Sequence, residues 1–142
     1  MKNLKLTIDM LPKGAWGKNL SKTIPQKDWD VIRKAVYEKA DNKCSCCGKS
    51  GDLEAHEVWD FDISTGTQTL TDIVALCTAC HGVKHIRHSQ MIGYGEHAKV
   101  HFLKVNNCSL NDFAEHFFDA QNLFDERNKI DKWVVEVPAL DL

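Results

Sequence analysis

Apolar and polar residues alternate at the start of the chain, where Leu4, Leu6 and Ile8 are separated by polar side chains. This period of two predicts a short, half-buried strand over residues 4–9. The next stretch, residues 11–26, contains Pro and Gly at intervals too short for a regular element, so it is expected to form turns. Its Trp16 is expected to pack against the rest of the domain.

Three stretches show the spacing of an amphipathic helix instead. Trp29, Ile32 and Val36 predict a helix over residues 26–40. A second helix of about ten residues is expected to end at residues 106–107, and a last helix is expected to begin after Ser109 as its N-cap. The apolar positions of these two helices are Ala98, Phe102 and Val105, then Phe113, Phe117, Ala120 and Phe124.

The middle of the chain has strand character. LEAHEVWDFD at residues 53–62, the turn-like STG, and TQTL at residues 67–70 predict a β-hairpin. Its Trp59 and Phe61 are expected to pack the hairpin, with stacking on a nucleobase as the alternative. A helix is expected over residues 76–88, and residues 133–137 predict a terminal strand that could pair with the N-terminal one. Strands and helices in this order predict an α+β fold.

Composition narrows the class of protein. A chain of 142 residues, 43 % of them hydrophobic, fits one domain over residues 1–142 and excludes global disorder. The first ten residues lack the apolar core of a signal peptide, and no segment is apolar enough to cross a membrane. Four of the six cysteines form two Cys-x-x-Cys pairs, which is typical of metal binding in a reducing compartment. We therefore expect a soluble, cytoplasmic protein with no membrane partner.

The net charge of −2 hides strong segregation along the chain. Residues 1–49 carry eleven Lys and Arg against five Asp and Glu, whereas residues 50–76 carry six acids and no Lys or Arg. Residues 77–104 are basic again and hold five of the seven histidines, and residues 105–142 are acidic. An acidic stretch between basic ones suits a metal-dependent phosphodiesterase, but it is equally compatible with a patchwork of solvated faces.

The two Cys-x-x-Cys pairs predict a structural zinc site. Cys44 with Cys47 and Cys77 with Cys80 offer four thiolates, which zinc prefers in a tetrahedron. Between the pairs lie 29 residues, a length that one hairpin accounts for. Cys46 competes for a place in the first pair, but only Cys44 and Cys47 have the same spacing as the second pair.

A group of acidic and histidine residues lies between and after these pairs: His56, Glu57, Asp72, His81 and His85. His81 and His85 are four residues apart, so they share one face of a helix and could hold one ion. The alternative is that His56 and His81 only brace the cysteine site.

These motifs resemble the HNH endonuclease family, whose fold is a ββα-metal unit. The resemblance covers residues 29–88 and rests on Cys44-x-x-Cys47-Gly, on Leu53-Glu-Ala-His56-Glu57-Val, and on Asp72-Ile-Val-Ala-Leu-Cys77-x-x-Cys80-His81-x-x-Lys84. A phage and bacterial group of small HNH-like proteins is also similar in three segments: WGKNL at residues 16–20, HEVW at residues 56–59 and CHxxKH at residues 80–85. The resemblance implies a zinc-stapled core at about residues 41–90, flanked by a strand and helix in residues 1–40 and by helices and a strand in residues 91–142.

The resemblance also implies roles. In one register His56 takes the metal-ligand position and Glu57 that of the general base. In the other, His56 is the base and Ala55 occupies the ligand position. Asp72 falls where the family has Asn, His81 is the last motif histidine, and His85 adds a spacing seen in colicin nucleases. Neither register reproduces the full family set.

The leading hypothesis is an HNH-type endonuclease that hydrolyses phosphodiester bonds in DNA with a second divalent cation, Mg²⁺, Mn²⁺ or Ni²⁺, beside the structural Zn²⁺. Lys84 and Arg87 are expected to contact DNA phosphates. A catalytically degenerate HNH-like zinc module that binds nucleic acid or a protein partner, for example as a phage inhibitor of a host defence system, is the alternative. A phosphodiesterase acting on RNA or a signalling nucleotide is the third possibility.

Overall fold

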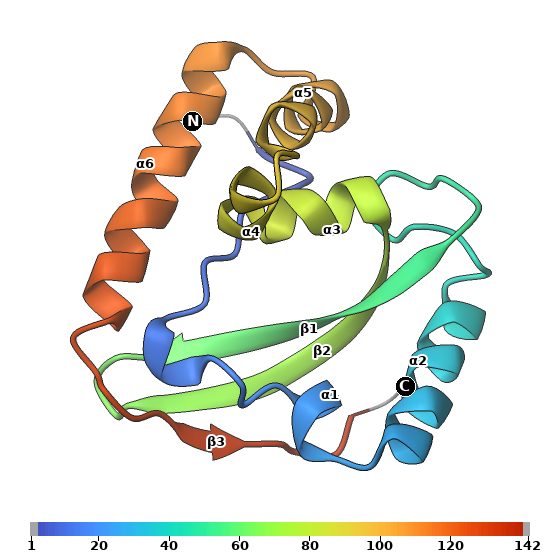
Figure 1. Cartoon of the computed structure of the whole chain (residues 1–142), viewed down its shortest axis with the longest axis vertical. Coiled ribbons are helices and arrows are strands. Elements are labelled where there is room, and N and C mark those ends of the chain that lie inside the picture. Colours follow the sequence, from blue (N-terminus) through green and yellow to red (C-terminus); the bar gives the residue numbers. More distant parts are fainter. Residues whose placement is uncertain (1–2, 141–142) are drawn as a thin grey trace.

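The computed structural model describes residues 3–140 and places a long β-hairpin between two groups of helices (Figure 1). Strands β1 (Leu53–Asp62) and β2 (Thr67–Cys77) pair antiparallel, and the short β3 (Val134–Glu136) lies parallel beside β2. The α+β class and the hairpin are thus confirmed. The return strand continues to Cys77 instead of ending at Leu70, so β2 leads directly into the second cysteine pair.

The two faces of the hairpin carry different side chains because successive residues of a strand point to opposite sides. On β1, Ala55 faces helix α2 (Gln26–Lys39), whereas His56 faces the other group of helices. A bulge in β2, where Val58 pairs with Asp72 and Trp59 with Leu70, shifts the register by one residue. The shift lets apolar residues on both sides of the bulge face α2.

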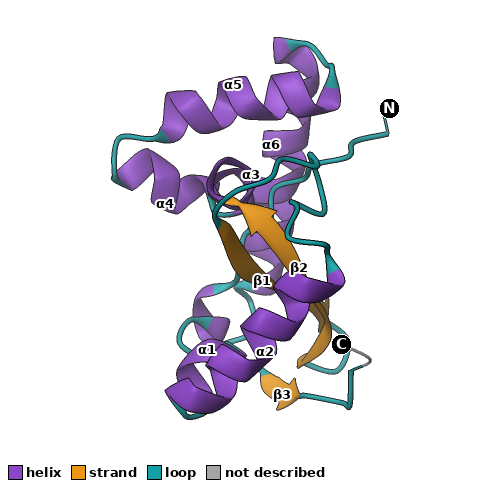
Figure 2. Cartoon of the chain, turned by 90° about the vertical axis from the view of Figure 1, so that its right-hand side faces the viewer, coloured by secondary structure: helices purple, strands orange, loops and turns teal. Residues whose placement is uncertain are grey.

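Helix α2 buries Trp29 and Val36 against one face of the hairpin, as its periodicity predicts. The opposite face packs against α3 (Thr78–Lys84). Helices α4 (Ile86–Met91) and α5 (Gly95–Asn106) pack on α3, and α6 (Leu110–Arg127) packs on α5, so the hairpin lies between two groups of helices (Figure 2). Helix α6 begins at the predicted N-cap, Ser109, which forms a capping box with Asp112.

The helix expected over residues 76–88 is divided in two. His85 has φ −107° and ψ 53°, which is not helical, so it ends α3 and precedes α4. The periodicity could not reveal this break because residues on both sides of it remain apolar at helical spacing.

The strand predicted over residues 4–9 is wrong. Its alternation is real, since Leu6 and Ile8 are buried, but none of the described strands pairs with this segment. Side chains of helices bind its backbone instead: Asn106 Oδ1 accepts from the amides of Lys5 and Leu6, and His116 Nε2 accepts from the amide of Ile8. Consequently the terminal strand β3 pairs with β2 rather than with the N-terminal segment.

Residues 11–26 also contain two short helices that the turn residues did not predict, the 3₁₀ helix η1 (Lys13–Ala15) and α1 (Leu20–Thr23). Trp16, which ends η1, is 61 % exposed, so the expectation that it packs into the domain is wrong. Within the described part of the chain, no helix combines the length and apolar character needed to span a membrane.

Candidate metal centres and the adjoining cleft

The first cysteine pair lies in a tight turn before β1. The amide of Cys47 donates to Cys44 Sγ at 3.5 Å, and the amide of Gly48 donates to the Cys44 carbonyl at 2.9 Å. Gly48 has φ +80°, a conformation that a residue without Cβ adopts at little cost. The amide of Ser45 donates to the Ala75 carbonyl, which fixes this turn against β2.

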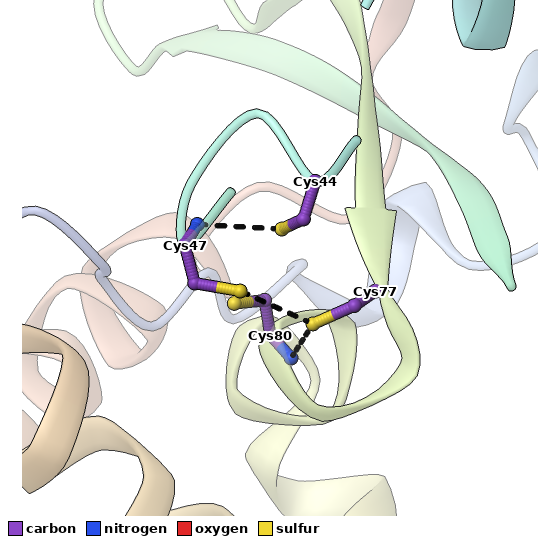
Figure 3. Close-up of side chains that lie close together, drawn as sticks. All are labelled: Cys44, Cys47, Cys77 and Cys80. Carbon is purple, nitrogen blue, oxygen red and sulfur yellow. Dashed lines mark hydrogen bonds between the residues drawn. The ribbon is translucent and has the colours of Figure 1, made fainter. Parts of the chain in front are cut away.

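The second pair joins the end of β2 to the start of α3. Cys77 is the N-cap of α3, and its Sγ accepts from the amide of Cys80 at 3.4 Å. Figure 3 shows the four side chains converging, with Cys47 Sγ and Cys77 Sγ 3.7 Å apart. All four sulfur atoms lie within 4.8 Å of one another, so the group could hold a metal ion such as zinc.

The surroundings of the thiols favour a bound cation. A hydrogen bond with Cys46, together with burial and the Cys77 thiol, raises the pKa of Cys80. Burial also opposes ionisation of Cys44, yet backbone amides, led by that of Cys47, lower its pKa to about 7. Four thiolates so close together need a compensating positive charge, which a divalent ion supplies.

One neighbour of this group was not foreseen. His101 on α5 places Nε2 3.2 Å from Cys80 Sγ. An imidazole N–H directed at a metal-bound thiolate would stabilise the negative sulfur. No spacing rule connects residues 80 and 101, so the sequence held no signal for this contact.

A second cluster lies beside the first and contains His56 from β1, His81 from α3 and His85 from the junction of α3 and α4. Their ring centroids are 4.8–5.2 Å apart, and one nitrogen from each lies within 4.8 Å of the others. The three histidines could therefore form a second metal site, and the predicted convergence of residues far apart in the chain is observed.

Two carboxylates orient this cluster, and neither was among the predicted site residues. Asp9 Oδ2 lies 3.2 Å from His56 Nε2, and Glu54 Oε1 lies 2.9 Å from His81 Nδ1. A carboxylate that holds one ring nitrogen fixes the tautomer and leaves the other nitrogen with a lone pair. Glu54 was within reach of sequence reasoning, because it shares a strand face with His56. Asp9 was not, because its segment was expected to be a strand beside the C-terminal one.

Burial keeps His81 and His85 neutral. Burial, reinforced by the neighbouring His81 and His56, lowers the pKa of His85 to about 3. Burial also lowers the pKa of His81, against the opposing effect of Glu54. Burial alone would raise the pKa of Asp9, but the hydrogen bond with His56 and the charge of Lys84 lower it. Neutral imidazoles beside an ionised carboxylate are the state that binds a divalent cation.

Two further predicted site residues lie outside the cluster. Glu57 points to the opposite face of β1, where its carboxylate oxygens accept from the amides of Leu20 at 2.6 Å and Ser21 at 3.1 Å. Asp72 pairs with Val58, and its Oδ1 accepts from the amide of Ile73. Glu57 thus caps α1, and neither carboxylate is among the three residues that converge.

The predicted DNA-contacting residues have internal partners. Lys84 Nζ donates to Thr7 Oγ1 at 2.9 Å and lies 3.6 Å from Asp9 Oδ2. The guanidinium of Arg87 lies over the ring of Phe117, 5.5 Å from its centroid. Arg87 remains exposed, so its predicted contact with phosphate stays open.

A cleft of about 750 Å³ opens beside the histidine cluster. Its lining combines the three clustered histidines with aromatic residues and with the η1–α1 segment that Glu57 holds against β1; the aromatic residues are Trp16, Trp59 and Tyr94. A molecule bound in this cleft would therefore lie beside the three histidines.

Comparisons of this chain with protein-family models, with curated proteins and with solved structures find no match. The resemblance to the HNH family consequently rests on the motif residues and on the order strand, strand, helix around the two clusters.

Proposed function

We propose that this protein is a metal-dependent phosphodiesterase of the HNH type that cleaves DNA. The observation that supports the proposal is the cluster of His56, His81 and His85, built on a β-hairpin and the following helix, beside four cysteines and open to a cleft.

The chain's own residues supply what such a site requires. Neutral His81 and His85 offer lone pairs at pH 7, while Asp9 and Glu54 fix the rings of His56 and His81. A divalent cation held there would stabilise the negative charge that develops on a phosphodiester during hydrolysis. The cysteine cluster would hold strand and helix in register, so that the three rings meet.

A second candidate function, a non-catalytic module that binds nucleic acid or a protein partner, is favoured by the position of Glu57. In this structure the carboxylate proposed as general base accepts two backbone hydrogen bonds on the other face of β1. A carboxylate engaged in this way is a poor base, and without a positioned base the histidine site could serve binding alone.

The test is cleavage of plasmid DNA with Mg²⁺, Mn²⁺ or Ni²⁺, with chelator controls. His81→Ala should abolish cleavage while zinc content and far-UV circular dichroism stay unchanged, because the loss of one ligand removes most of the stabilisation by the cation. His97→Ala, an exposed histidine on α5 outside the cluster, is the matched control.

Glu57→Gln decides between the roles of Glu57. We expect cleavage to persist in this variant, since the amide oxygen can still accept from one of the two α1 amides. A loss as large as that of His81→Ala would restore Glu57 as the base. If the wild-type protein cleaves no DNA with any of the three cations, the proposed cleavage of DNA is refuted.

A further inference from the structure

Trp16 is the most exposed aromatic side chain of the cleft, and its orientation is fixed. Its indole Nε1 donates to the Leu11 carbonyl at 2.9 Å, while 61 % of the residue remains accessible to solvent. Exposing so much apolar surface on a ring that is held in place has a cost, which a partner that covers the ring would remove.

The segment that carries Trp16 is anchored at several points. Glu57 caps the following helix α1, and Lys18 Nζ donates to the Trp133 carbonyl at 3.1 Å. The indole is therefore part of a fixed wall that faces the same cleft as the histidine cluster.

The charged side chains of the cleft lining are one lysine and two glutamates. Lys22 is exposed and could meet a phosphate, whereas Glu54 is held by His81 and Glu57 by two backbone amides. A volume of about 750 Å³ is within the usual range of sites for small ligands, which a nucleoside with its phosphate also fits.

We propose, on the basis of the function proposed above, that Trp16 is a stacking platform for an unpaired nucleobase and that the cleft takes single-stranded DNA. An aromatic face accepts any base that is not stacked in a duplex, whereas bases inside a duplex cannot reach the indole. The adjacent phosphate would then lie toward the histidine cluster.

The test is binding of a short labelled single-stranded oligonucleotide, and of the duplex of the same sequence, measured by fluorescence anisotropy at low salt without added divalent cation. Trp16→Ala should weaken single-strand binding about tenfold or more, which corresponds to about 1.4 kcal/mol, and should change duplex binding much less. Trp16→Phe should retain most of the affinity. Phe118→Ala, which removes a similarly exposed ring on α6, is the matched control and should have no effect.

Unchanged single-strand affinity in Trp16→Ala, an equal loss for the duplex, or no single-strand binding by the wild-type protein would overturn the inference. Cleavage is measured separately on both DNA forms. Trp16-dependent binding without cleavage would refute only the catalytic proposal, and cleavage with Trp16-independent binding would refute only the stacking role.

Discussion

At the scale of single residues, the second cluster depends on imidazoles that are largely buried. His56 is 3 % exposed, and the carboxylate that holds it comes from the N-terminal segment rather than from a neighbouring motif residue. Burial lowers the pKa of His81 and His85, and for His85 this has a measurable consequence for stability.

The stability of the protein should fall below pH 6.5 in a way that depends on His85. The pKa of His85 is 6.5 in the unfolded chain and about 3 in the folded protein, so only the unfolded chain gains this proton as the pH drops. The contribution of neutral His85 to the free energy of unfolding is fully present above pH 6.5. It is lost progressively toward pH 3, by up to about 1.4 kcal/mol per pH unit. Urea unfolding at pH 6.5 and 5.5 should show a smaller loss for His85→Asn than for the wild type; equal losses would contradict this assignment.

At the scale of elements, short segments are joined by side-chain contacts rather than by regular pairing. Asn106, at the end of α5, binds the backbone of the N-terminal segment three times, because its Nδ2 also donates to the Leu6 carbonyl at 2.9 Å. This anchor holds the segment whose Asp9 orients His56.

Asn106→Ala should lower the free energy of unfolding by about 1–3 kcal/mol, since it leaves the partly buried Leu6 amide and carbonyl without their partner. Hydrogen exchange of the Lys5 and Leu6 amides should accelerate in the variant. Asn111→Ala, at an exposed position of α6, is the control and should change neither quantity. Unaltered exchange in Asn106→Ala would show that other contacts hold the segment.

The junction of β2 and α3 should depend on zinc. We expect about one zinc per chain in the purified protein, and Cys80→Ser should unfold it, because such sites contribute on the order of 10 kcal/mol. Elemental analysis and thermal melting measure both effects. Cys46→Ser is the control, and this variant should keep its zinc. If Cys46→Ser loses zinc while Cys47→Ser retains it, Cys46 is the ligand instead of Cys47.

At the scale of the whole molecule, one hairpin serves two apolar cores. Leu70 and Ile73 belong to the core with α2, whereas Leu76 and Phe102 belong to the core with α3, α5 and the cysteine cluster. The cysteine and histidine clusters lie on the second side, so DNA is expected to approach that side of the molecule.

DNA binding should weaken steeply with salt, because contacts to phosphate release counterions. Arg87→Ala should reduce the slope of log affinity against log salt by about one. Arg33→Ala, on α2 across the hairpin, removes the same charge and should leave the slope unchanged; its pair with Asp30 is partly exposed and adds little stability. Fluorescence anisotropy over a range of salt concentrations measures the slope, and an absent salt dependence would exclude phosphate contacts.

Lys84→Ala should also weaken binding, but it breaks the bonds to Thr7 and Asp9 as well.

The sequence alone determined the features that depend on local spacing. Helix α2 and the N-cap at Ser109 follow from patterns within a few residues, and the paired cysteine spacings indicated which four thiols converge. The three histidines of the second cluster were also predictable, since their spacing matches a motif.

The tertiary structure decided everything that depends on the direction of a side chain or on contacts between distant segments. Glu57 follows His56 directly, yet the alternation of β1 turns it to the opposite face, where it caps α1. The alternation at residues 4–9 correctly indicated which side chains are buried, but it did not indicate what binds the backbone of this segment. An asparagine and a histidine on helices can accept hydrogen bonds from backbone amides as well as a neighbouring strand does. Asp9 and Trp16 acquire their positions only when these segments dock onto the hairpin, and no local pattern encodes that docking.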